Sequence, residues 1–418
     1  MPAMQPNNTR LLHTAQYATL LIPLANCFSI FVADALMAIV AILFLVESAR
    51  SKNWGWTKSP WVRVALLLWV YLMVDSLFAE HIDKALRRST VWIRYPVFTA
   101  GLVYWLWNAE FGKKLLLSVA VSVIFLVGDS LLQYAIGYDI IGRPSIGEDG
   151  KTLRLTGPYK DPRVGITLVW LAFPVVLYGL SLLRKTDIAT WQKLGAVLLA
   201  LAFVLAVFLS GERMALLLTG LGIGLAVLCI RSIRMPLIAA GVVAALIGFG
   251  IAQLNPQLIE RQYASTLHVI QNLEDTVYGK IWQSAWDVGS DYPITGVGLR
   301  HFREHCPDAK YGPIEELAPR CNLHPHNIYL EWWVESGIIG LAMFLLMAAL
   351  WARNAAKAWP ACKHDAIYIG LLITLALRLW PIASTTSFFI AWSAVPFWLT
   401  IGWLLAYSQT HRTQGENT

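Results

Sequence analysis

Two histidines, His324 and His326, stand directly before a long apolar stretch in the segment LHPHNIYLEWWVESGIIG. Pro325 between them fixes a backbone angle that suits a helix start, and the apolar run begins two residues after His326, so His326 is expected near a helix N-terminus. The helix dipole there disfavours the imidazolium form, and a neutral imidazole is a general base near pH 7. We therefore predict that His326 is the catalytic base and that Asn327 orients it or binds the substrate. A histidine that only caps the helix or accepts a hydrogen bond is the alternative.

Arginines in the polar segments between apolar runs are a second group of candidates: Arg87, Arg88, Arg154, Arg213 and Arg300. The planar guanidinium group suits bidentate binding of phosphate. Arg213 lies in SGERMALLL, a short turn between two apolar runs that has no need of a cation, and charges at membrane depth are usually functional or paired. We predict that Arg213 and Arg300 bind a phosphate-bearing, lipid-anchored ligand, with the other three in a secondary role. Neutralisation by nearby acids such as Glu212, or contact with lipid headgroups, is the alternative.

A metal site built on the two histidines is a rival hypothesis. His324 and His326 alternate along the chain, and His301 or His305 could join them as ligands. However, the sequence has no D-x-D, E-x-D, D-x-E or E-x-E motif to supply carboxylates, and alternate histidines alone are a weak metal motif. We therefore expect no metal and no cofactor. A G-x-S-x-G serine nucleophile motif is also absent.

The elements that must position these residues are apolar and repetitive. The chain has 418 residues, of which 57% are hydrophobic and 14% are charged, whereas a soluble protein has about 25% charged residues. Runs of a length that crosses a bilayer as a helix recur from end to end. We predict an all-α, polytopic membrane protein in one domain, residues 1–418, with about twelve spans. The expected spans are 11–29, 32–49, 64–80, 90–107, 115–136, 164–183, 194–210, 214–230, 237–254, 326–350, 366–384 and 391–408.

The loops between these spans indicate the orientation. Placing both termini in the cytoplasm gives the cytoplasmic loops an excess of lysine and arginine, as the positive-inside rule requires. Two stretches on the other side, 137–163 and 255–325, exceed what a connector needs, and long loops usually carry function. Residues 411–418 are expected to form a disordered cytoplasmic tail. Cys306 and Cys321 both lie in the larger loop, so we predict that they form a disulfide rather than two free thiols.

Several of these motifs resemble one known family, the bacterial O-antigen ligases and the related O-antigen polymerases. The resemblance lies in HNIYLEWWVESGIIG, where a His-Asn pair is followed by Gly337 and Gly340, and in PITGVGLRHF and SGERMALLL upstream. The expected twelve spans, with one large loop before the histidine-bearing span, are similar to this family as well. Gly337 and Gly340 also make a small-residue step that lets a helix pack closely on its neighbour.

The resemblance implies an inverting, metal-independent glycosyltransferase with the lipid-donor, GT-C-like architecture. It would transfer O-antigen polysaccharide from undecaprenyl diphosphate to the lipid A core oligosaccharide at the periplasmic side of the bacterial inner membrane. The arginines would take the role of a metal and stabilise the leaving diphosphate, and Asn327 could bind a sugar hydroxyl. No nucleic-acid partner is expected. The alternatives are an O-antigen polymerase, a pilin-type O-oligosaccharyltransferase and a non-enzymatic transporter of lipid-linked sugars.

Overall fold

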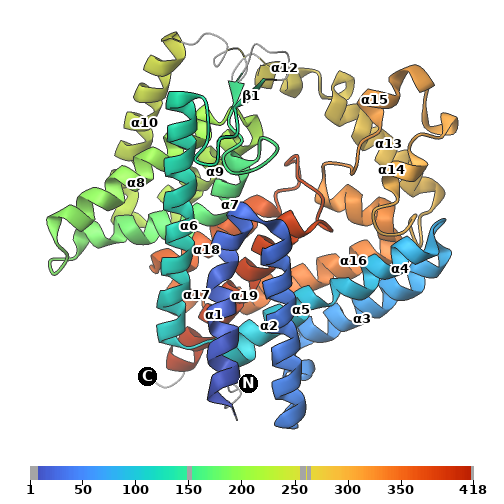
Figure 1. Cartoon of the computed structure of the whole chain (residues 1–418), viewed down its shortest axis with the longest axis horizontal. Helices are drawn as coiled ribbons and strands as arrows, with labels where there is room; N and C mark the ends of the chain where they lie inside the picture. The colour runs from blue at the N-terminus through green and yellow to red at the C-terminus, as the bar shows by residue number, and fades with distance from the viewer. Residues whose placement is uncertain (1–7, 148–152, 255–259, 261–264, 416–418) are drawn as a thin grey trace.

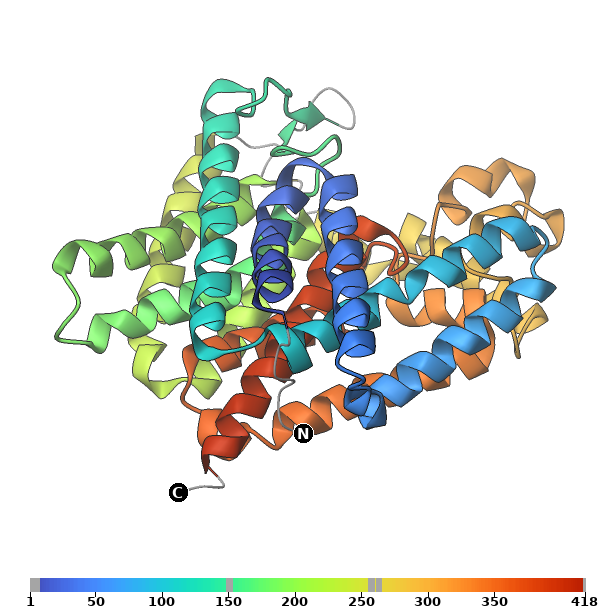
Figure 2. The same cartoon turned by 60° about the horizontal axis from the view of Figure 1, so that its bottom comes forward.

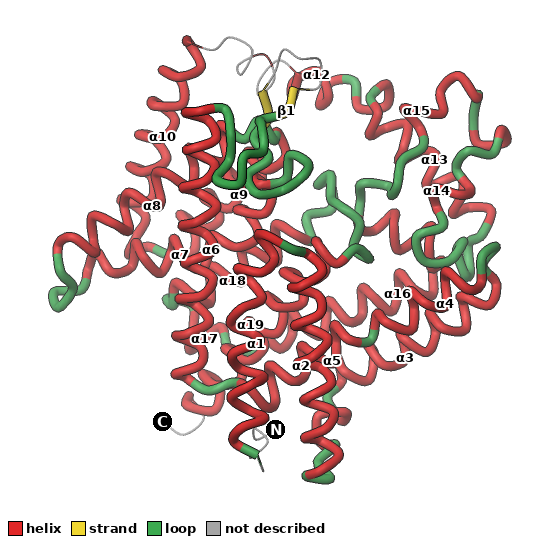
Figure 3. The backbone as a smooth tube through the Cα atoms, viewed as in Figure 1, coloured by secondary structure: helices red, strands yellow, loops and turns green. Residues whose placement is uncertain are grey.

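The computed structural model describes residues 8–147, 153–254, 260 and 265–415, and this part of the chain is almost entirely helical (Figure 3). Among the described residues, seven helical stretches are long and apolar enough to cross a membrane, and two further apolar helices are shorter. The seven are Ile30–Arg50, Pro60–Phe78, Ala109–Ile136, Val164–Arg184, Thr190–Leu209, Arg231–Ile251 and Ile328–Ala356, and the shorter two are Arg213–Cys229 and Ala366–Arg378. The predicted helical chain with several membrane spans is confirmed, whereas the total of twelve stays a prediction.

The elements follow one another along the chain in the order that Figure 1 colours from blue to red. Those before residue 165 are α1 (Thr9–Phe28), α2 (Ile30–Arg50), η1 (Gly55–Lys58), α3 (Pro60–Asp75), η2 (Ser76–Phe78), α4 (Ile82–Trp92), α5 (Arg94–Gly101), the π-helix η3 (Leu102–Leu106), α6 (Ala109–Ile136), β1 (Ile146–Gly147) and β2 (Leu153–Arg154). The middle of the chain forms α7 (Val164–Ser181), η4 (Leu182–Arg184), α8 (Thr190–Leu209), α9 (Arg213–Cys229), η5 (Arg231–Ile233) and α10 (Arg234–Leu254).

The remaining elements comprise a group of short helices and then the last membrane helices. The short ones are α12 (Ser265–Gln271), η7 (Leu273–Asp275), α13 (Val277–Asp291), α14 (Phe302–His305), η8 (Ala309–Tyr311), η9 (Ile314–Glu316) and α15 (Leu317–Arg320). They are followed by α16 (Ile328–Ala356), α17 (Trp359–Cys362), α18 (Ala366–Arg378) and α19 (Ala391–Gly415). Strands β1 and β2 pair in antiparallel fashion, with Ile146 opposite Arg154.

Helix α7 lies at the centre of the bundle. It packs against α6, α8 and α18, and its residues are buried on nearly every side. A helix that is apolar all round is stable only in such a position. Helices α3, α4 and α16 extend together away from this bundle, on the side where α13 to α15 lie (Figures 1 and 2).

Residues 265–325 form a small folded lobe rather than an open loop. The lobe lies at the end of the molecule opposite the two termini, as does the β1–β2 segment (Figure 1). It has a core of its own, in which residues of α13, the following loop and Phe302 surround Val334 of α16. Cys306 and Cys321 form the predicted disulfide, with their Cα atoms 5.7 Å apart. Residues 255–259 and 261–264 of the predicted loop lie outside the described residues.

The observed helices differ from the predicted spans at three places. The span predicted at 90–107 begins earlier, at Ile82, and is divided into α4, α5 and η3. Helix α18 ends at Arg378 rather than at residue 384, because Pro381 cannot continue a helix and disfavours helical backbone before it. Helix α19 continues to Gly415, so most of the predicted tail is helical, and residues 416–418 lie outside the description.

Candidate active site

His326 lies immediately before the helix that the sequence predicted. Helix α16 begins at Ile328 with Asn327 as its N-cap. The His326 backbone is left-handed, with φ of 56°, a conformation that is uncommon for a residue other than glycine and costs about 1–3 kcal/mol. Its carbonyl oxygen accepts a hydrogen bond from the N–H of Thr385 at 2.8 Å, and its Nε2 lies 3.2 Å from Nδ2 of Asn322. Asn322 thus holds the ring of His326, and Thr385 holds its backbone, at the start of α16.

The second histidine lies against the first. The ring centroids of His324 and His326 are 4.1 Å apart, and Nε2 of His324 is 3.3 Å from the Thr385 carbonyl oxygen. Burial lowers the pKa of His326. Burial also lowers the pKa of His324 to about 3, with further lowering from its neighbour His326 and then from the charges of Arg163 and Arg300. Both rings are therefore neutral at pH 7, chiefly because they are withdrawn from water.

Asn327 is occupied by the helix it begins. Its Oδ1 accepts hydrogen bonds from the N–H groups of Tyr329 and Leu330, at 3.0 and 3.2 Å, and its Nδ2 donates to the Pro381 carbonyl oxygen at 2.8 Å. These bonds satisfy N–H groups that the first turn of a helix leaves free. In the structure Asn327 therefore fixes the start of α16 and the segment after α18, while binding of a sugar hydroxyl stays a prediction.

A break in α16 receives the segment that leads to Arg300. Gly337 has φ of 62° and ψ of −170° inside the helix, which is a conformation that essentially only glycine adopts. A Cβ atom there would overlap the carbonyl oxygen of Ile294. The segment before Arg300 fits into this break. The N–H groups of Val297 and Gly298 donate to the carbonyl oxygens of residues 334 and 335 at 2.9 and 3.0 Å. In return, the N–H of residue 338 donates to the carbonyl oxygen of residue 293 at 2.9 Å.

Arg88 holds the same segment from the other side. Its guanidinium NH1 donates to the carbonyl oxygens of Leu299 and Arg300 at 2.9 and 3.2 Å. The Arg88 side chain is half-buried, near the like charges of Arg300 and Arg303 and the opposite charge of Glu335. Arg88 therefore acts on Arg300 through its backbone, which is itself left-handed with φ of 60°.

The turn that carries Arg213 is tied to the start of α7. Glu212 is buried, and its carboxylate accepts hydrogen bonds from the N–H groups of Gly165 and Ile166 at 2.6 and 3.2 Å. Burial raises the pKa of Glu212 to about 7, while Arg154 and Arg163 act to lower it. Arg213 follows as the first residue of α9 and is half-buried. The structure thus places Arg154 and Arg163 near Glu212, and Arg163 and Arg300 near His324.

Residues 194–345 match the family model described as O-antigen ligase. Over this stretch, the chain is similar to the O-antigen ligase family. The matched stretch runs from α8 into α16 and includes Arg213, Arg300 and His326, whereas Arg87, Arg88 and Arg154 precede it. No curated protein and no solved structure matches the chain. The family indicates glycosyl transfer of the ligase or polymerase type.

Two arginines have positions that the sequence did not reveal. Arg87 lies on α4 with 75% of its side chain exposed at the protein surface, and its NH2 is 3.7 Å from Asp83. Arg163 was not among the predicted site residues, yet its charge acts on both Glu212 and His324. It contacts Trp392 with its guanidinium 4.7 Å from the ring centroid. The sequence marks Arg163 only by its place directly before a predicted span.

Two buried acids on α16 also escaped the sequence analysis. Glu331 and Glu335 are almost fully buried, and Glu331 accepts a hydrogen bond from the N–H of Phe388 at 2.6 Å. Glu335 lies near enough to Arg88 for their opposite charges to attract. Acids inside an apolar span are costly and usually functional or paired. The two glutamates stand in an apolar run of the sequence, so this signal could have identified them.

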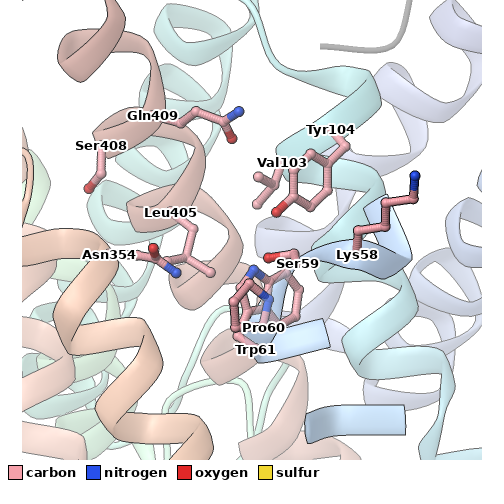
Figure 4. Close-up of a pocket in the computed structure, with 10 residues that line it drawn as sticks. All are labelled: Lys58, Ser59, Pro60, Trp61, Val103, Tyr104, Asn354, Leu405, Ser408 and Gln409. Atoms are coloured by element: carbon pink, nitrogen blue, oxygen red, sulfur yellow. The ribbon is translucent and has the colours of Figure 1, made fainter. Parts of the chain in front are cut away.

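A cavity of about 240 Å³ lies away from these residues, at the end of the bundle that carries the termini (Figure 4). Asn354 of α16 and Gln409 of α19 face Tyr104 and Lys58 across it. Its lining contains no histidine and no arginine, so it lacks the groups expected of the transfer site. Among the described residues, no cluster of three or more histidines, cysteines or acids could hold a metal ion, and the metal-free mechanism stays a prediction.

Proposed function

We propose that the protein is an inverting, metal-independent O-antigen ligase. It transfers O-antigen polysaccharide from undecaprenyl diphosphate to a sugar of the lipid A core oligosaccharide. The observation that carries this proposal is a half-buried histidine pair, with ring centroids 4.1 Å apart, in which the charges of Arg163 and Arg300 act on His324, most of it within the stretch that matches the family model. A neutral base and a cationic phosphate site are the two parts that such a transfer requires.

The proposed reaction is a single displacement. Nε2 of His326 takes the proton from the acceptor hydroxyl as its oxygen attacks the anomeric carbon of the donor sugar. The bond from that carbon to the diphosphate oxygen breaks, and the diphosphate leaves from the opposite face, so the anomeric configuration inverts. Arg213 and Arg300 hold the diphosphate, where preorganised positive charge stabilises the leaving group most strongly, and Arg154 and Arg163 contribute charge nearby.

The proposed setting is the bacterial inner membrane, with the transfer site on the periplasmic side. Both termini are placed in the cytoplasm and residues 265–325 in the periplasm, within one integral membrane domain of GT-C-like architecture. The position of the lobe opposite the termini supports this orientation, as does the disulfide in it, since disulfides persist in oxidising compartments. Helices α1, α4 to η3, α9, α18 and α19 would supply the further crossings that bring the total to twelve.

Reconstitution decides between this proposal and its alternatives. The purified protein in proteoliposomes receives undecaprenyl-diphosphate-linked glycan, with rough lipopolysaccharide or without any acceptor, in the presence of EDTA. Glycan attached to lipopolysaccharide is the expected product. Chain growth in the absence of lipopolysaccharide identifies a polymerase, transfer to pilin alone a protein glycosyltransferase, and movement of the donor across the bilayer with no new covalent product a transporter. Activity that EDTA abolishes and added magnesium or zinc restores contradicts the metal-free mechanism.

A further inference from the structure

A cavity of about 530 Å³ opens between the lobe and the first turn of α16. One wall is α13, which contributes Trp282, Gln283 and Trp286, and the opposite wall contributes Tyr311. Leu330 of α16 closes its base. None of these residues has a part in the reaction proposed above, and the volume is ample for a few sugar rings.

The lining has the chemistry of a carbohydrate site. Trp286 is 56% exposed, although a tryptophan side chain gains much from burial, and its ring stacks on Trp333 of α16 at 5.8 Å between centroids. A pyranose ring has an apolar face of C–H groups that can cover such an indole. The Trp282 N–H is buried and has no hydrogen-bond acceptor within the described part of the chain. The amide of Gln283, which already bonds Asp287 at 2.8 Å, lies beside them as a polar partner for sugar hydroxyls.

The walls of the cavity are held in place before any ligand arrives. Arg320 is buried and lines the cavity, and its guanidinium donates to the carbonyl oxygens of residues 306, 307, 308, 312 and 313. The disulfide between Cys306 and Cys321 closes the same segment. A preformed site loses little conformational entropy when it binds a ligand.

The cavity also lies on a distinct side of His326. Tyr278, next to the cavity residue Gly279 on α13, meets the His326 ring edge-on at 5.8 Å between centroids. The arginine charges act instead on His324, whose pKa Arg163 and Arg300 lower, whereas the lowering at His326 comes from burial alone. The His326 ring thus contacts α13 on one side and, on the other, His324, on which the arginine charges act.

We propose that this cavity binds the saccharide of the acceptor and presents one of its hydroxyls to His326. This inference rests on the proposed transfer, in which the diphosphate of the donor occupies the arginine side. Trp286 and Trp282 provide the surfaces on which acceptor sugars stack, and Gln283 bonds their hydroxyls.

The test is direct binding, which does not require turnover. Core oligosaccharide, released by deacylation from rough lipopolysaccharide of the bacterium that makes this protein, is titrated calorimetrically into the full-length protein in detergent. Trp286→Ala is expected to weaken binding about tenfold, Trp286→Phe about twofold, and Trp282→Ala at least as much as Trp286→Ala. Trp191→Ala is the matched control, because Trp191 is 73% exposed at the start of α8 and far from the lobe in sequence, and it should bind as the unchanged protein does.

The outcomes separate this inference from the proposed function. Weakened oligosaccharide binding in the two lobe variants, together with a raised acceptor KM and an unchanged kcat, supports the acceptor site even if the exact product of transfer differs. Unchanged binding in both variants, with normal thermal stability, overturns it while leaving the proposed ligase intact. Weakened binding of the lipid-free O-antigen polymer alone also overturns it, because the cavity would then hold the donor glycan.

Discussion

Replacing Gly337 by alanine should uncouple the Arg300 segment from α16. The left-handed backbone at this position costs a residue with a Cβ about 1–3 kcal/mol. The new Cβ would also overlap the Ile294 carbonyl oxygen. If the segment moves away, three backbone hydrogen bonds across the break are lost, each worth about 0.5–1.5 kcal/mol. Loss of these three bonds costs about 3 kcal/mol in total, which is less than the roughly 5–15 kcal/mol that keeps a domain folded, so the segment is expected to detach locally while the protein stays folded.

The expected result is a folded membrane protein with a displaced Arg300. Because a displacement of about 1 Å can cost roughly a hundredfold in rate, transfer by Gly337→Ala should fall at least a hundredfold, and amide hydrogens at residues 294–300 should exchange faster. Gly220→Ala is the matched control, since a Cβ at this position of α9 meets nothing and alanine favours a helix. It should keep full activity. A Gly337→Ala protein with normal turnover and normal exchange would refute the role given to the break.

Three further predictions concern the groups at the reaction centre. If His326 is the base, His326→Ala should abolish transfer and leave donor binding intact, whereas His324→Ala should be much milder; comparable losses in single-turnover assays would favour shared metal ligation instead. If Arg213 grips the diphosphate, Arg213→Ala should weaken donor binding as well as rate, and Arg213→Lys should rescue only part, since an ammonium lacks the bidentate contact; equal rescue by lysine would argue against that contact. Because burial lowers the pKa of His326 below its ordinary value of about 6.5, kcat/KM should stay level as the pH falls through 6.5 and decline only below it, and an acid limb centred above 6.5 would contradict a buried base. The same shift means that the unfolded chain takes up the proton first, so this histidine should make the protein less stable as the pH falls below 6.5.

The parts of the site that the sequence predicted are those that local chemistry determines. The start of α16 follows from Pro325 and the apolar run, and the pairing of Cys306 with Cys321 follows from their confinement to one loop. The contacts of Arg88 with residues 299 and 300 join segments more than two hundred residues apart, and no spacing in the sequence indicates them. No spacing in the sequence indicates the contacts of Thr385 with His324 and His326 either.

Two local features were visible in the sequence but had more than one meaning. Gly337 fits a small-residue step on a continuous helix as well as the break that the structure shows, because glycine is tolerated in both. The segment around Pro381 is apolar enough for its hydropathy to predict a continuing span. The predicted span therefore extended past the proline, to residue 384. Arg163 sits at a predicted loop border, where basic residues are common, so its place beside His324 emerges only when α7 packs against the turn before α9.

The disulfide of the lobe sets the stage of biogenesis at which the cavity beside His326 is complete. Cys306 and Cys321 close the segment that Arg320 holds, and this segment forms one wall of the cavity beside His326. In the proposed orientation, these cysteines meet an oxidant only after the lobe has been exported. A newly made chain would therefore insert its membrane helices first and complete the wall of the cavity last, so that maturation is set by the oxidising machinery of the compartment in which the substrates reside.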